Sequence, residues 1–136
     1  MNTYDLKGNK RTSFYKESID INLTYIINES IEENIVAIFV IEAVDLGMTI
    51  MSVSTKDKIK LANSVGVHNI SCVIDISNFS FREYSIRVSL SSNDMLVNYD
   101  TWYDSSRFYI ESNNIEHINL DTNSIIISDY KFIQKN

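Results

Sequence analysis

The chain has 136 residues, of which 44% are hydrophobic, and it carries a formal net charge of -6. This length fits one domain, residues 1–136, and the hydrophobic content excludes a disordered chain. The excess of acidic residues disfavours nucleic acid, anionic membrane surfaces and phosphate-rich polymers as partners, because these recruit clustered Lys and Arg.

No apolar run approaches the roughly 20 residues that cross a bilayer, and the first residues lack the apolar stretch of a signal peptide. The single cysteine, Cys72, excludes an intrachain disulfide and favours a reducing compartment. We therefore expect a cytoplasmic protein. Cys72 is in phase with Ile70 and Ile74, which predicts a buried and unreactive thiol.

Most of the chain alternates apolar and polar residues with the period of a β-strand, and each alternating segment ends at a turn signal. Residues 35–44 are instead apolar at nearly every position, which predicts a central strand covered on both faces. Residues 55–67 are expected to form a loop, a helical turn at 58–63 being the less favoured alternative. The expected strands are a short one ending at 14–15, then 19–27, 35–44, 49–54, 68–76, 84–90, 95–102, 107–110, 124–127 and 130–133.

About eight or nine strands with short turns and no long helix predict an all-β, immunoglobulin-like antiparallel β-sandwich. The strand alternation also predicts which side chains point inward. The expected core contains Leu23, Tyr25, Ile38, Val40, Ile74, Tyr84, Ile86 and Val88.

Catalytic and metal-binding motifs are absent from the sequence. There is no G-x-x-x-x-G-K-[ST] phosphate loop and no G-x-S-x-G nucleophile motif. His68, His117 and Cys72 are too few and too scattered for zinc, and His68 is expected to be structural. We therefore expect no enzyme activity, no cofactor and no metal. The less favoured alternatives are a glycosidase carboxylate pair and a calcium site formed by Asp100, Asp104 and Asp121.

A candidate ligand site lies on the hairpin expected from residues 84–102. Closing this hairpin with Ser91 opposite Leu96 would pair Ser89 with Asn98. It would also bring the six side chains of the candidate site together on the outer face. Sugars bind through aromatic rings against their C–H faces and polar groups against their hydroxyls, so serines would form a floor beside a stacking tryptophan. The carbohydrate-binding set is Ser85, Arg87, Ser89, Asn98, Asp100 and Trp102.

Two less specific interpretations of this hairpin remain open. Arg87 and Asp100, which this register pairs, would then form an ordinary surface ion pair that contributes little. Trp102, which the register places beside Ser85, would then pack under the next loop.

The order of strands and turns carries a further signal. An aromatic residue and a glutamate precede the first long alternating strand; a buried strand, a glycine turn and a Ser-Thr pair follow. Next come a glycine, an aromatic loop, a Glu-Tyr pair that opens a strand, and a Tyr-Asp pair before the last aromatic strand. The residues that carry this order are Phe14, Glu17, 19–25, 36–44, Gly47, Ser54, Thr55, Gly66, 68–76, 79–81, Glu83, Tyr84, Tyr99, Asp100 and Phe108.

In this pattern, residues 5–111 resemble the C-terminal carbohydrate-binding domain of the Wzt-type ATPase subunits. Those subunits belong to ABC transporters that export O-antigen and related cell-surface polysaccharides. The chain departs from the family where Lys16 and Ser18 stand at the place of a glycine and Ser54 at the place of an asparagine. It also lacks the glycine expected before Tyr84.

The resemblance implies a non-catalytic module that binds a lipid-linked, O-antigen-like polysaccharide. Its partners would be the ATPase and membrane subunits of the transporter, at the inner face of the cell membrane. It also implies a homodimer that exchanges the last strands, residues 124–133. Because residues 125–127 are β-branched on both faces, an uncovered strand there would invite aggregation. The alternative function is a ligand-free structural or oligomerisation sandwich within a larger protein.

Overall fold

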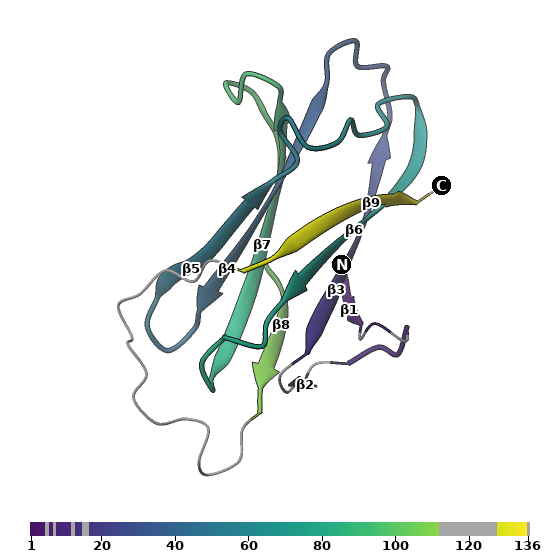
Figure 1. Ribbon diagram of the computed structural model, residues 1–136. Coiled ribbons are helices and arrows are strands. Elements are labelled where there is room, and N and C mark those ends of the chain that lie inside the picture. Colours follow the sequence, from purple (N-terminus) through teal and green to yellow (C-terminus); the bar gives the residue numbers. More distant parts are fainter. Residues whose placement is uncertain (5, 7, 12, 15–16, 112–127, 136) are drawn as a thin grey trace.

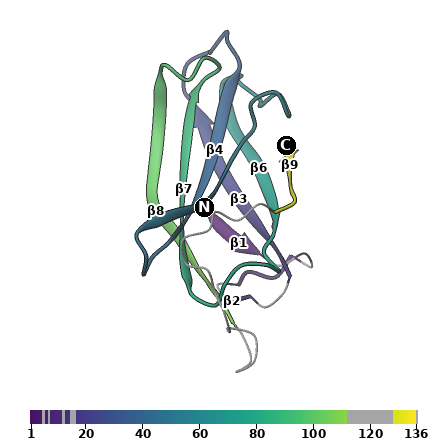
Figure 2. The same cartoon turned by 60° about the vertical axis from the view of Figure 1, so that its left-hand side comes forward.

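The computed structural model describes residues 1–4, 6, 8–11, 13–14, 17–111 and 128–135. Within these residues the chain forms nine strands and no helix, arranged in two sheets that face each other (Figures 1 and 2). The predicted all-β sandwich is therefore confirmed. The strands are β1 (Asn2–Tyr4), β2 (Ser13–Phe14), β3 (Ser18–Ile27), β4 (Ile35–Ala43), β5 (Met48–Ser54), β6 (Gly66–Asp75), β7 (Glu83–Ser92), β8 (Asn98–Ile110) and β9 (Tyr130–Lys135).

The strand order resembles that of an immunoglobulin-like sandwich, with the last strand, β9, at the edge beside β6. One sheet has the order β1-β3-β6-β9 and the other has the order β2-β8-β7-β4-β5. β3 pairs with β6 in the first sheet, and β4, β7 and β8 are neighbours in the second, as the B–E and C–F–G strands are in that fold. All the pairs are antiparallel except β2 with β8.

A tyrosine corner supports this assignment. Tyr84 is the second residue of β7, and its hydroxyl donates a hydrogen bond to the carbonyl of Ser80, at 2.7 Å. A tyrosine that reaches back over the corner before strand F is a hallmark of this fold. Its ring stacks on Phe108 and meets the edge of Phe79, with centroids 5.3 and 5.2 Å apart. The Glu-Tyr pair recognised in the sequence thus closes one end of the core.

The hydrophobic core fills the space between the sheets, and strand alternation decides which residues enter it. The odd-numbered residues of β3 from Ile19 to Ile27 are buried, as the sequence predicts. The same holds for the even-numbered residues of β6 from His68 onward and of β7 up to Leu90. Cys72 belongs to this core, and its burial raises the pKa of the thiol.

The predicted facing of β4 is wrong. The core takes Ile35, Ala37, Phe39, Ile41 and Ala43, whereas Ile38 and Val40 lie on the other face of the strand. A strand that is apolar at nearly every position gives no alternation from which its inner face can be read. Only pairing with β7, where Phe39 lies opposite the inward Val88, decides the facing.

Other boundaries also differ from the sequence prediction. The two strands expected at 95–102 and 107–110 form one continuous strand, β8, and the short strand β1 was not predicted. Residues 55–65 form a turn and loop, not a helix, as expected. The predicted strand at 130–133 is present as β9, which pairs with β6. The strand expected at 124–127 lies outside the described residues.

Candidate functional site

The pairing of β7 with β8 differs from the register that defined the candidate site. Ser89 lies opposite Thr101, not Asn98, and Val88 lies opposite Trp102. The expected pairs Arg87–Asp100 and Ser85–Trp102 are therefore wrong. The hairpin also closes between other residues than expected, because the backbone N–H of Ser92 donates a hydrogen bond to the carbonyl of Val97, at 2.8 Å.

A β-bulge at Tyr99 reverses the facing of the strand that follows it. Leu90 lies opposite Asp100 and Ser91 opposite Asn98, so Tyr99 is the extra residue. Because side chains alternate with a period of 2, one extra residue sends every later side chain to the other face. Asp100 and Trp102 consequently lie on the inner face of the sheet, and the predicted set of six is divided between two faces.

Four of the predicted residues share the outer face of the five-stranded sheet, the face turned away from the other sheet. Arg87 pairs with Glu42, at 3.4 Å, and its guanidinium lies 5.9 Å from the ring centroid of Tyr103. The Thr101 hydroxyl lies 3.2 Å from that of Ser89 and accepts a hydrogen bond of 2.7 Å from the Asn98 amide. Arg87 therefore forms its ion pair with Glu42 and not with Asp100, the residue expected from the sequence. The four outer-face residues are Ser85, Arg87, Ser89 and Asn98.

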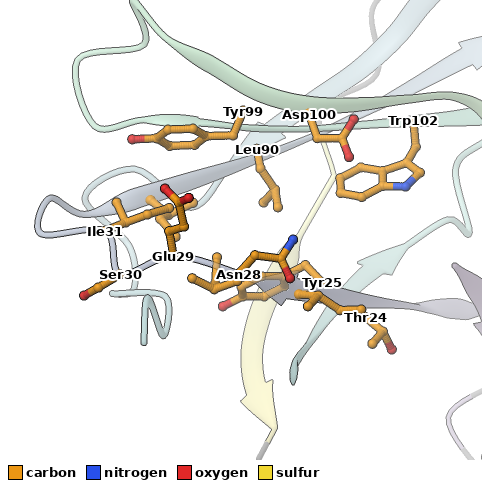
Figure 3. Close-up of a pocket in the computed structure, with 13 residues that line it drawn as sticks. Thr24, Tyr25, Asn28, Glu29, Ser30, Ile31, Leu90, Tyr99, Asp100 and Trp102 are labelled. Carbon is orange, nitrogen blue, oxygen red and sulfur yellow. The ribbon is translucent and has the colours of Figure 1, made fainter. Parts of the chain in front are cut away.

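Asp100 and Trp102 instead line an open pocket of about 800 Å³ between the two sheets. We call it the inter-sheet pocket. Figure 3 shows Tyr99, Asp100 and Trp102 along β8 on one side, Thr24, Tyr25 and Asn28 on the other, and Leu90 between them. Its thirteen lining residues are Thr24, Tyr25, Ile26, Ile27, Asn28, Glu29, Ser30, Ile31, Ile35, Leu90, Tyr99, Asp100 and Trp102.

The sandwich is open here because two strand edges are left uncovered. β1 pairs with β3 only up to Asn22, and β2 pairs with β8 only at Tyr109 and Ile110. In the described part of the chain, no other strand pairs with the free edge of β3 beyond Asn22 or of β8 before Tyr109. The inter-sheet pocket lies between these two edges.

The pocket combines an apolar interior with polar groups at its mouth. Leu90 is buried, whereas Trp102 is half-buried and packs partly against the core. Tyr25 is buried, and its hydroxyl donates a 2.7 Å hydrogen bond to the carbonyl of Ala62, so it serves as wall. The groups available to a ligand are the indole of Trp102, the ring of Tyr99 and the polar side chains of Asn28, Glu29 and Asp100.

A carboxylate holds Tyr99 at the pocket mouth. The Tyr99 hydroxyl donates a hydrogen bond to Glu33, which raises the pKa of the phenol. Burial and the negative charges of Glu33 and Asp94 raise it further. The Asp100 carboxylate accepts a 2.8 Å hydrogen bond from the backbone N–H of Thr101 and forms no ion pair with the described residues.

Sequence reasoning missed the side of the pocket that β3 and the β3–β4 loop supply. The expected strands leave residues 28–34 only as a connection, although the segment NESIEEN concentrates two amides and three carboxylates directly after a strand. That composition was the available signal. The segment lies about seventy positions from Trp102 in the sequence, and the two come together only when the sheets pack.

The structure also places the other groups singled out in the sequence. His68 is buried, and its Nε2 lies 2.7 Å from the carbonyl oxygen of Ser64. No group of three or more His, Cys, Asp or Glu residues within the described part of the chain is arranged to hold a metal ion. Of the alternative calcium ligands, Asp121 and the side chain of Asp104 lie outside the described residues. The described ranges contain no helix that is long and apolar enough to cross a membrane.

Comparison with known proteins identifies no family. No protein-family model matches the chain, and no curated protein matches it significantly. Function is therefore argued from the inter-sheet pocket itself.

Proposed function

We propose that the protein is a non-catalytic carbohydrate-recognition module that binds a cell-surface polysaccharide in the inter-sheet pocket. The observation that carries this proposal is the half-buried indole of Trp102, which lines an open pocket together with Tyr99, Asp100 and Asn28. Aromatic rings pack against the C–H faces of a sugar. Amide groups donate hydrogen bonds to its hydroxyls or accept them, and carboxylates accept hydrogen bonds from its hydroxyls. β8 alone supplies both kinds of group, aromatic rings and a carboxylate, along one wall of the pocket.

An open pocket with few anchors supports weak binding. We expect micromolar to millimolar dissociation constants, roughly -4 to -8 kcal/mol. Such affinity suits a polymer that must be held and then released.

The resemblance to the Wzt-type domains supports a particular kind of polysaccharide as the ligand. We propose that it is lipid-linked and O-antigen-like, and that the domain holds it for export by an ABC transporter. The ATPase and membrane subunits of that transporter would then be its partners, at the inner face of the cell membrane. Two copies of the domain would match the paired ATPase subunits.

A second candidate function is a ligand-free structural or oligomerisation domain, and one observation favours it. The uncovered edge of β8 is flanked by apolar side chains, since Leu96 is 85% exposed and Tyr103 is 72% exposed. An exposed strand edge with apolar neighbours is a template for a strand from another protein.

Intrinsic fluorescence tests the carbohydrate proposal directly, because Trp102 is the only tryptophan in the chain. Titration with the surface polysaccharide of the producing organism is expected to change its emission and to protect it from iodide quenching. Absence of any binding, together with tight binding of a protein partner, would favour the second candidate.

Two neighbouring aromatic residues provide matched variants. Trp102 and Tyr103 are adjacent on β8 but lie on opposite faces of the sheet. By calorimetry, Trp102→Ala is expected to weaken binding about tenfold or more, and Tyr103→Ala to leave it unchanged. The reverse result would place the ligand on the outer face. Circular dichroism checks that both variants fold, and Trp102→Phe replaces Trp102→Ala if the latter unfolds.

A further inference from the structure

The charged groups of the inter-sheet pocket are all of one sign. Among its thirteen described lining residues, Glu29 and Asp100 are the only ionisable groups besides tyrosine, and none is Lys, Arg or His. Glu33, which binds the Tyr99 hydroxyl, adds a third carboxylate at the mouth. A group of lysines that includes Lys56 lines a different pocket on the loop after β5.

These carboxylates are not neutralised by the described part of the chain. No ion pair within it involves Glu29, Glu33 or Asp100. By contrast, Glu42 on the outer face is paired with Arg87. At the pocket mouth, the hydrogen bond to Glu33, burial and the charges of Glu33 and Asp94 raise the pKa of Tyr99. A ligand that enters the pocket therefore meets uncompensated negative charge beside apolar surface.

Aromatic rings next to carboxylates form a favourable environment for an organic cation. An ammonium group is attracted to the face of an indole or phenol ring and donates up to three hydrogen bonds. Figure 3 shows the Asp100 carboxylate on β8 between the rings of Tyr99 and Trp102, with Asn28 across the gap. An anionic sugar at this place would lose its hydration without gaining a cationic partner.

We propose that the inter-sheet pocket selects saccharides that carry a free, protonated amine and disfavours saccharides that carry carboxylate or phosphate groups. This selectivity rests on the proposed carbohydrate-binding function. It narrows the ligand to a polysaccharide that contains unacylated amino sugars.

Three oligosaccharides of equal length test the selectivity: a glucosamine hexamer, the N-acetylglucosamine hexamer and a galacturonic acid hexamer. Below the pKa of the amine, the glucosamine hexamer is expected to bind at least about tenfold more tightly than its acetylated counterpart. The galacturonate hexamer is expected to bind most weakly. Raising the pH until the amine is neutral is expected to abolish the preference without affecting the acetylated hexamer.

Charge-removing variants separate the pocket from the net charge of the protein. Asp100→Asn and Glu29→Gln are expected to reduce the preference severalfold. Glu32→Gln, in the same loop but outside the pocket lining, and Asp129→Asn, before β9, are expected to preserve it. Equal loss in all four variants would assign the preference to the overall charge of -6 and overturn the proposal.

Two other outcomes would also overturn it. Acetylated or acidic hexamers that bind as tightly as the amine, in a manner that Trp102→Ala weakens, would refute the selectivity while leaving carbohydrate binding intact. No binding by the glucosamine hexamer would likewise refute it. Carbohydrate binding itself is then judged by the titration with the organism's own polysaccharide.

Discussion

Tyr84 shows how one residue defines an end of the sandwich. Its hydroxyl donates to the carbonyl of Ser80, and its ring is completely buried between Phe79 and Phe108. Burial raises the pKa of Tyr84, and also that of Tyr25 in the opposite sheet. The unfolded chain would release these protons nearer the ordinary value of 10.0.

The first prediction concerns this hydroxyl. Tyr84→Phe is expected to lower the free energy of unfolding by about 1 kcal/mol at neutral pH, because it removes the contacts of this hydroxyl with the part-buried carbonyl and the hydroxyl of Ser80. Urea titration followed by circular dichroism measures the loss. Tyr103→Phe, whose ring is 72% exposed, is the matched control and is expected to change stability by less than about 0.5 kcal/mol.

The same raised pKa values predict an alkaline loss of stability. Below about pH 9 the tyrosines are protonated in both states, so their contribution is fully present. As the pH rises past about 10, the unfolded state loses its protons first, and stability falls until the folded groups also titrate. Tyr84→Phe is expected to reduce this alkaline loss, whereas Tyr103→Phe keeps it. An identical pH profile for all three proteins would contradict the assignment.

At the scale of single elements, β4 and β8 show where alternation is informative and where it is not. The alternating strands β3, β6 and β7 have the predicted facing. β4 is apolar on both faces, so its sequence is compatible with either orientation. β8 alternates, but its bulge at Tyr99, the second residue of the strand, reverses the phase of the residues that follow. A bulge depends on how two strands pair, and neither strand encodes it alone.

The facing of β4 is tested by two neighbouring substitutions. Phe39 is fully buried and lies 5.8 Å from the ring of Phe132 on β9, whereas Ile38 is half-buried on the outer face. Phe39→Ala is expected to cost about 3–5 kcal/mol, and Ile38→Ala about 1 kcal/mol. Denaturant unfolding measures both. Comparable losses, or a larger loss for Ile38→Ala, would restore the facing expected from the sequence.

For the whole molecule, the position of β9 bears on assembly. Among the described strands, β9 lies at the edge of its sheet and pairs only with β6 there. Its Phe132 packs against Phe39 of the opposite sheet, so β9 closes the core as well as the edge. Domain swapping would place the identical strand of a second copy at this edge.

We therefore predict a homodimer that depends on the C-terminal segment. Sedimentation equilibrium at tens of micromolar protein is expected to give twice the chain mass. Deletion from Asn123 onward is expected to abolish the dimer, because it removes the strand available for exchange. A monomeric full-length chain would contradict the prediction, and a dimer that survives the deletion would show that another surface holds the two copies together.

The sequence by itself determined the all-β class, most strand positions and the inner faces of β3, β6 and β7. It did so because strand alternation and turn residues are local signals that each segment carries independently. Tertiary structure alone decided that Asp100 and Trp102 leave the set formed with Ser85, Arg87, Ser89 and Asn98. The pairing of β8 with β7 and its bulge are properties of two strands together, which neither strand encodes alone. The contact of β8 with the β3–β4 loop joins segments distant in sequence, and it arises only when two sheets pack and leave one side of the sandwich open.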